Sequence, residues 1–276
     1  MPTQLLIYKE AIPVSKLTHK DWSINTNPDF SFAQGLNSVP LMSIEFTNAV
    51  TEYPIVFTGT EEEIIPAVIL GIKSEENLYV AQNGTWEGKY IPAFVRRYPF
   101  VFSSNDNGEN FTLYIDQEFV GWNQDGIGER LFDDQGEQTQ YLVNILGFLQ
   151  EYQVQFQRTQ NFCKKLKELN LLEPMKADFT LITNEKTSLT GFMGINQESL
   201  KKLSSEQLMD LMQSDELELV YLHLQSMRNL SALVDRMSLK ASQNQQQQLV
   251  DKEATQLIQN NNIVEEESIF ANTGVV

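Results

Sequence analysis

Residues 51–57 read TEYPIVF and residues 96–102 read RRYPFVF, so the motif Tyr-Pro-x-Val-Phe occurs twice in the chain. The residues after each proline are β-branched or aromatic, and such side chains favour β-strands. Proline is tolerated at the first residue of a strand and on edge strands. Each copy of the motif therefore predicts the beginning of a β-strand.

Each copy is followed by a second strand-like run at the same distance, PAVILGI at 66–72 and FTLYID at 111–116. LYVAQNG at 78–84 and LFDDQGE at 131–137 extend the similarity, and an insertion at 121–129 accounts for their wider spacing. One interpretation is a duplicated β-meander. The alternative is that Tyr-Pro recurs because proline and aromatic residues suit the start of a strand. Both interpretations give the motif a structural role.

The first half of the chain alternates short apolar runs with segments rich in glycine, asparagine, aspartate and serine, which form turns. This pattern predicts eight to ten strands within residues 1–140. The runs expected to be strands include MSIEF at 42–46, NLYVA at 77–81, YIPAFV at 90–95 and EFVGW at 118–122.

The periodicity changes after residue 138. Apolar residues in 141–172 recur at intervals of three and four, which predicts a long amphipathic helix. Residues 175–195 predict a hairpin with a turn at 184–186. A short helix, a second helix capped at Ser204 and a longer helix from about 215 to 237 are expected to follow.

The separation of strands from helices predicts an α+β fold with mostly antiparallel pairing. We expect a β-rich portion over 1–140 and a mainly helical portion over 141–240 that packs on it as one unit. Residues 241–276 are acidic and rich in glutamine and asparagine. They offer little apolar area to offset the entropy of ordering, so a flexible tail is expected.

Composition narrows the classes of function. The chain of 276 residues is 41% hydrophobic and has a formal net charge of −17, which indicates a globular protein that does not bind nucleic acid or anionic membranes through charge. Met1 is followed by polar residues, and no apolar run reaches the ~18–20 residues of a transmembrane helix. We therefore expect a cytoplasmic protein without a transmembrane segment.

Few residues indicate metal, cofactor or catalytic chemistry. Cys163, His19 and His223 are the chain's full set of cysteine and histidine, too few for a zinc cluster, and both histidines are expected to be structural. Neither G-x-G-x-x-G nor G-x-x-x-x-G-K-[ST] occurs, so no nucleotide cofactor is expected. Residues 122–134 match a calcium loop only in part, and their spacing predicts a turn-rich loop. No metal site, cofactor or catalytic set is predicted.

The segment GTWEGKYIPAFVRRYPF at 84–100 places two adjacent arginines among aromatic rings. A guanidinium beside rings can bind a carboxylate, a phosphate or a peptide terminus through two hydrogen bonds. In a strand the two arginines would face opposite sides, so at most one would enter a given pocket. The alternative is that the rings form core and one arginine pairs with a nearby acid. The ligand-binding candidates are Trp86, Tyr90, Arg96, Arg97 and Tyr98.

Eight blocks in order, from VPLMSIEF through EYPIVF, PAVILGIKSEENLYV, GTWEGKYIPAFVRRYPF, GERLFDDQGE, TQNFCKKLKELNLL and LTGFMGI to YLHLQSMRNLSALVDR, resemble the SapC family of bacterial proteins. The resemblance covers about residues 4–237. The family is named for its association with a surface-layer gene cluster, and relatives are often encoded near tryptophan-halogenase-like and cupin-like proteins. The resemblance implies an accessory role and brings no catalytic residues with it.

Taken together, these features predict a non-enzymatic accessory protein that binds a protein or peptide in a surface-layer, export or peptide-modification pathway. The alternative is an enzyme, or a subunit of an oxygenase or halogenase, with catalytic residues dispersed in sequence. A pocket with converging polar groups near Arg96, Arg97, Glu129 or His223 would favour the enzyme. A groove, an apolar patch or an open sheet edge would favour binding. The oligomeric state is left open.

Overall fold

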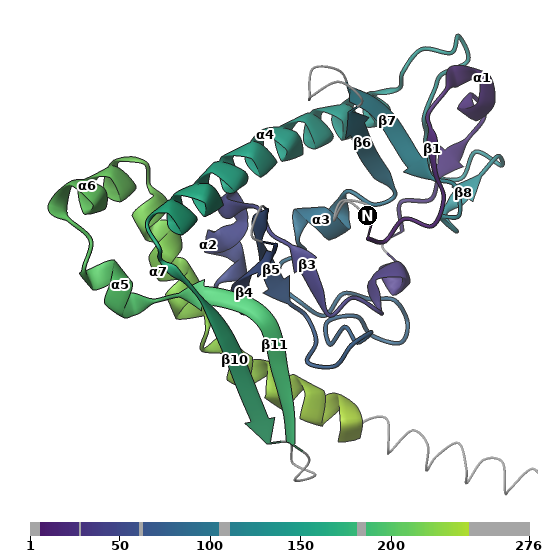
Figure 1. Ribbon diagram of the computed structural model, residues 1–276. Coiled ribbons are helices and arrows are strands. Elements are labelled where there is room, and N and C mark those ends of the chain that lie inside the picture. Colours follow the sequence, from purple (N-terminus) through teal and green to yellow (C-terminus); the bar gives the residue numbers. More distant parts are fainter. Residues whose placement is uncertain (1–5, 28, 61–62, 105–110, 181–185, 243–276) are drawn as a thin grey trace, which may run out of the picture.

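A computed structural model describes residues 6–27, 29–60, 63–104, 111–180 and 186–242 (Figure 1). The tail predicted for 241–276 lies outside these ranges except for its first two residues, and the predicted turn at 184–186 falls largely outside them. Strands dominate the first half of the chain and helices the second, so the predicted α+β class is confirmed.

The central sheet has five antiparallel strands. Their spatial order is β10 (Leu172–Thr180), β11 (Lys186–Ile195), β4 (Ile55–Gly59), β5 (Ile64–Ile69) and β3 (Ser38–Pro40). Phe57 of β4 lies against Phe162 and His223, with ring centroids 6.3 and 5.1 Å apart. Helices α4 (Gln140–Glu168) and α7 (Glu216–Ser226), which carry these partners, therefore cover the face of the sheet to which Phe57 points.

Two three-stranded sheets, which we call the small sheets, lie beside the central sheet and its covering helices. One contains β1 (Ala11–Pro13), β7 (Phe111–Asp116) and β6 (Phe100–Ser104), and the other contains β8 (Trp122–Asn123), β2 (Ser23–Ile24) and β9 (Glu129–Arg130). Helix α1 (Lys16–His19) and the 3-10 turn η2 (Ser31–Ala33) connect the first strands.

The two Tyr-Pro motifs occupy equivalent places. Each begins the first strand of an antiparallel hairpin, β4–β5 or β6–β7. The carbonyl of Pro54 accepts a hydrogen bond from Ile69 N (3.0 Å), and that of Pro99 accepts one from Asp116 N (2.9 Å). Measured from the proline, the second hairpin is two residues longer than the equal sequence spacing suggested. The repeated motif thus sets the start of two hairpins.

Four of the expected strands are wrong. MSIEF forms the 3-10 turn η3 (Ser43–Glu45) and leads into helix α2 (Phe46–Ala49), while YIPAFV contains helix α3 (Ala93–Arg96). Within the described residues, NLYVA contributes an isolated bridge at Val80 and EFVGW contributes the first residue of β8. The turn η3 and the helix α3 are both stabilised by the carboxylate of Glu45. It accepts hydrogen bonds from Met42 N (2.8 Å), at the start of η3, and from Ala93 N (2.7 Å), at the start of α3.

The long helix predicted for 141–172 is confirmed as α4, which ends earlier, at Glu168. Thr139 caps it by accepting a hydrogen bond from Leu142 N (3.3 Å). Its 29 residues span about 44 Å. The first half buries Leu142 and Leu149 against the small sheets, and the second half buries Phe162 and Leu166 against the central sheet. Helix α4 therefore joins the hydrophobic core of the small sheets to that of the central sheet (Figure 1).

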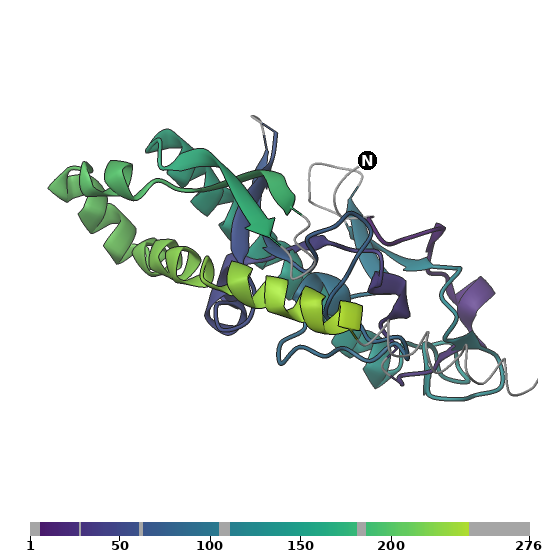
Figure 2. The same ribbon diagram turned by 90° about the horizontal axis from the view of Figure 1, so that it is seen from below.

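The described part of the chain ends in four helical segments. These are α5 (Gln197–Lys201), α6 (Ser205–Gln213), α7 and the helical residues 229–242. Ser204 and Gln207 form a reciprocal cap at the start of α6, as the sequence predicted for Ser204. The single helix expected over 215–237 is interrupted after Ser226, and its two parts follow one another along one side of the molecule (Figure 2). Among the described helices, none is long and apolar enough to cross a bilayer.

Candidate functional site

The five residues predicted to bind a ligand do not share one surface. Trp86 and Arg97 are buried, Tyr90 and Tyr98 are half-buried, and Arg96 is exposed. Arg96 ends helix α3 and Arg97 follows as its cap, so the strand geometry expected for the pair is wrong. The helical turn nevertheless directs the two guanidinium groups into different surroundings.

Arg97 lies in the interior, where only 2% of its surface is exposed. Its guanidinium carbon lies 4.5 Å from the centroid of the Phe94 ring and 4.8 Å from that of Tyr152. Tyr8 approaches from a third side at 6.0 Å. Burial raises the pKa of Tyr8, and the positive charge of Arg97 opposes that shift. Cation–π contacts of this kind make Arg97 a part of the packing between the N-terminal segment, α3 and α4.

Tyr98 holds the N-terminal segment in place. Its hydroxyl donates to Asp116 Oδ2 (3.0 Å), and its ring stacks on Phe32 with centroids 4.1 Å apart. The fully buried Asp116 also accepts hydrogen bonds from Lys9 N and Glu10 N, both at 3.0 Å. The carboxylate therefore joins β7 to the residues that precede β1.

Tyr90 and Trp86 are also engaged within the protein. The Tyr90 hydroxyl donates to Glu45 Oε1 (2.6 Å), and Trp86 Nε1 donates to Tyr53 Oη and to the Tyr90 carbonyl, both at 3.2 Å. Burial raises the pKa of Glu45, while its hydrogen bonds from Tyr90, Ala93 and Met42 act in the opposite direction. This carboxylate caps helical turns, and only 3% of the surface of Glu45 is exposed.

Arg96 is the candidate that remains on the surface. Its Nε donates to the carbonyl of Ile91 (2.9 Å), and its guanidinium carbon lies 5.3 Å from the Phe148 ring and 5.9 Å from the Tyr90 ring. These contacts hold the side chain against an aromatic surface and leave the charge exposed.

The two histidines are buried, as expected for structural residues, and Cys163 is buried as well. His223 accepts from Ile195 N through Nε2 (3.0 Å) and donates from Nδ1 to Ile55 O (2.8 Å). His19 Nδ1 lies 3.0 Å from Ser15 N. Burial lowers the pKa of both histidines and raises the pKa of the Cys163 thiol to about 12. At neutral pH, Cys163 is therefore a thiol and a poor nucleophile.

The partial calcium motif forms a loop between β8 and β9. Asn123 Oδ1 accepts from Asp125 N (3.2 Å) and Ile127 N (3.0 Å), and Arg130 pairs with Asp134 (2.7 Å). In the described part of the chain, no three residues of the metal-ligating types come together in a geometry that would hold an ion.

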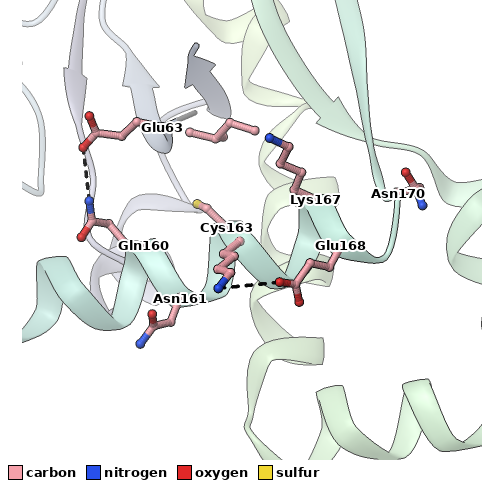
Figure 3. A pocket seen from close by; sticks show the side chains of 9 residues that line it. Glu63, Gln160, Asn161, Cys163, Lys167, Glu168 and Asn170 are labelled. Carbon is pink, nitrogen blue, oxygen red and sulfur yellow. Dashed lines mark hydrogen bonds and ion pairs between the residues drawn. The ribbon is translucent and has the colours of Figure 1, made fainter. Parts of the chain in front are cut away.

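A cavity of about 620 Å³ lies where the turn between β4 and β5 meets the C-terminal end of α4 (Figure 3). Gln160 Nε2 donates to Glu63 Oε1 (3.2 Å) across the gap, and Lys164 pairs with Glu168 at 3.9 Å on the helix. We call this the α4-end cavity, and its lining residues are Glu63, Ile64, Gln160, Asn161, Cys163, Lys164, Lys167, Glu168 and Asn170.

The lining of the α4-end cavity suits recognition of a polar ligand. Three side-chain amides, from Gln160, Asn161 and Asn170, offer donors and acceptors together. Ammonium and carboxylate groups surround them, while Ile64 and Cys163 provide apolar surface. The volume falls within the range of about 300–1,000 Å³ that is usual for ligand sites.

Sequence analysis missed this cavity because its two walls lie far apart in the chain. Glu63 and Gln160 are 97 positions apart, and their contact follows from the placement of α4 across the sheet. The one local signal was KKLKE at 164–168, a concentration of lysine in an acidic chain.

Two smaller hollows are present. One, of about 520 Å³, lies between α6 and the residue that follows α4, and another, of about 100 Å³, lies on the central sheet. In the described part of the chain, none of these three hollows is lined by Arg96, Arg97, Glu129 or His223. The polar side chains that would have favoured an enzyme are therefore not gathered around any of the three.

The edge of the central sheet that is formed by β10 is poorly suited to pairing with another strand. Its last strand, β10, carries Pro174 and an irregular register between Met175 and Ala177. Glu173, Lys176 and Asp178 are exposed along it. Proline, bulges and charges are the usual devices that block edge-to-edge association.

A family model described as SapC matches residues 14–233, which is well over half of the chain. No curated protein and no solved structure matches it.

Proposed function

This chain belongs to the SapC family, and we propose that it is a non-enzymatic accessory protein that binds a peptide or protein segment in the α4-end cavity. The pathway we propose for it concerns a bacterial surface layer, export or peptide modification. The observation that carries the proposal is the combination of size and lining in this cavity.

An extended peptide presents alternating N–H and C=O groups. The amides of Gln160, Asn161 and Asn170 can donate to the carbonyls and accept from the amide protons. Charged side chains of the peptide can pair with Glu168 or Lys164 at the rim. Recognition of this kind needs no activated nucleophile and no metal.

The position of the reactive side chains supports binding over catalysis. A general base or nucleophile must reach the substrate. His223 uses both ring nitrogens within the core, and Cys163 is a buried thiol with a raised pKa. Of the five residues that the sequence nominated, we propose Arg96 as a second contact with the partner, projecting from a surface that the other four residues stabilise.

The test is site-specific photo-crosslinking in the protein's own cells. A photoreactive phenylalanine analogue replaces Asn161, an exposed residue of the cavity lining, or Gln150, an exposed residue about three turns earlier on the same helix. We expect a protein or peptide adduct at position 161 that mass spectrometry identifies, and none of the same mass at position 150. Equal adducts at both positions, or none at either, would contradict the proposal.

A blocking variant provides a second readout. Gln160→Trp places an indole in the cavity, and Gln150→Trp places the same ring on the free face of the helix. The first variant should remove the captured partner and the second should retain it, with both folded by circular dichroism. Retention of the partner by Gln160→Trp would place binding elsewhere.

A further inference from the structure

Helix α6 exposes methionine where a surface helix usually exposes polar residues. Leu211 is fully buried against the core, while Met209 is 53% exposed and Met212 is 64% exposed. The two methionines are three positions apart and therefore neighbours on one face. Methionine is flexible and polarizable, and exposed methionines are characteristic of surfaces that bind apolar partners of varied shape.

A stripe of polar and acidic residues runs beside the two methionines. Glu206, Asp210 and Gln213 follow the spacing of four and three residues that places them along one side of α6. Together with Leu169, Gln207 and Met209 they line the hollow of about 520 Å³. The hollow is therefore lined by both apolar and acidic side chains, and we call the hollow together with the adjoining Met212 the α6 surface.

The residues that line the hollow include two acids, Glu206 and Asp210, and no lysine or arginine. From residue 203 to residue 227 the chain contains five acidic residues, and Lys201, Lys202 and Arg228 flank this segment. Lys165 of α4 reaches this region, but it is engaged by two of those acids, at 3.0 Å from Asp210 and 2.6 Å from Glu216. Glu206 contributes a further negative charge at the rim.

We propose that the α6 surface docks a cationic amphipathic helix of a partner protein. Apolar side chains of the partner lie on Met209 and Met212, and its lysine or arginine side chains pair with Glu206, next to the Asp210 that Lys165 engages. The nine residues of α6 span about 13 Å, enough to support about two turns of a partner helix. The proposal rests on the proposed function in one respect, that this chain binds proteins.

Charge complementarity selects this occupant over two others. A second copy of the chain would bring the same acidic stripe and a formal net charge of −17. The residues of this chain after 242 contain one lysine and five acids. Like charges repel both of these across the rim, whereas a cationic helix is attracted to it.

The test uses the full chain and a fluorescein-labelled helical peptide of about 15 residues, built from leucine on one face and lysine on the other. Fluorescence anisotropy is measured at low and at raised salt. We expect binding that weakens about tenfold in Met209→Ser/Met212→Ser, because apolar contact area is lost. Glu206→Gln should weaken binding less and reduce its dependence on salt. Leu239→Ser, at a residue 65% exposed on another helical segment, is the matched control and should change nothing.

Two control peptides separate specific docking from simple attraction between opposite charges. A scrambled peptide with the same composition has no apolar face, and a leucine–glutamate peptide has the opposite charge. Both should bind at least tenfold more weakly than the leucine–lysine helix. Equal binding of the scrambled peptide, or equal binding by Met209→Ser/Met212→Ser, would overturn the proposal.

The blocking variant Gln160→Trp distinguishes this proposal from the proposed function. It should leave the leucine–lysine peptide bound. If it weakens the peptide as strongly as the methionine variant does, the peptide occupies the α4-end cavity and the α6 proposal is wrong, while the proposed function stands. If no variant and no wild-type protein binds the peptide, the α6 proposal is wrong and the crosslinking result alone decides the function.

Discussion

The protonation state of His223 is determined by its neighbours. Ile195 N–H donates to Nε2, so Nε2 carries no proton, and the proton on Nδ1 is donated to the carbonyl of Ile55. One neutral imidazole thus joins α7 to strands β11 and β4. Protonation of Nε2 would place two donors against each other inside the core, and burial lowers the pKa of His223 to about 4.

This depressed pKa predicts a loss of stability in mild acid. The unfolded chain protonates His223 below about pH 6.5, whereas the folded chain does so only below about pH 4. Between these values the unfolded state holds more protons, so the free energy of unfolding falls as the pH falls. Its full contribution, about 3 kcal/mol, is present above pH 6.5. Urea unfolding at pH 7 and pH 4.5 measures the loss.

His223→Gln isolates this effect. The variant should be less stable than the wild type at pH 7 by about 1–3 kcal/mol, because the buried Ile195 N–H and the Ile55 carbonyl lose their hydrogen-bond partner. Its stability should change less between pH 7 and pH 4.5. The pKa of His19 is also lowered by burial, so some pH dependence will remain in the variant. Identical pH dependence in the two proteins would contradict the assignment.

Short and long elements differ in how far the sequence reveals them. Helix α4 is predictable because its apolar positions repeat over 29 residues. Helix α3 and the turn η3 are each one turn long, and they depend on the carboxylate of Glu45, which reaches across the fold to Ala93 N (2.7 Å). No local pattern contains that contact, so their runs of apolar residues resembled strands.

Helix α6 depends on a single cation of α4 for part of its attachment. Lys165 Nζ lies 2.6 Å from Glu216, 3.0 Å from Asp210 and 3.4 Å from Ser214 Oγ. Hydrogen bonding to Glu216 raises the pKa of this lysine, so it stays charged at physiological pH. The ion pairs join the end of α4 to both α6 and α7.

Lys165→Met should loosen α6 more than it destabilises the whole protein. Partly exposed ion pairs are worth about 0.5–1 kcal/mol, so the global free energy of unfolding should change little. Hydrogen exchange measured by mass spectrometry should be faster in residues 205–213. Lys164→Met is the control, because Lys164 faces solvent and pairs with Glu168 at 3.9 Å. Equal exchange in α6 of both variants would show that Lys165 does not anchor it.

The α4-end cavity and the α6 surface arise from the arrangement of the whole chain. Glu63 and Gln160 form a hydrogen bond across the α4-end cavity, and Leu169 lines the α6 surface together with residues of α6. The segment 84–100 predicts a ligand site because its arginines and aromatic rings are adjacent in the chain. Folding buries Trp86 and Arg97 of this segment and leaves Arg96 on the surface. The residues that line the α4-end cavity and the α6 surface share no sequence motif, and only the fold brings them together.

The position of α4 also bears on whether the two halves are one unit, which the sequence predicted and which remains a prediction. Leu149 packs in the core of the small sheets and Phe162 in the core of the central sheet, on the same helix. Neither core can unfold without exposing part of α4. Leu149→Ala and Phe162→Ala should therefore each destabilise one common transition, by about 2–5 kcal/mol.

Two spectroscopic probes test this cooperativity. Trp22 and Trp122 lie with the small sheets, so tryptophan fluorescence reports strongly on that region, while far-UV circular dichroism reports on helices in both. Urea unfolding followed by the two signals should give coincident midpoints in the wild type and in both variants, because a shared helix couples the cores. An earlier fluorescence transition in Leu149→Ala alone would mean that the small sheets unfold independently and that α4 connects two separately stable units.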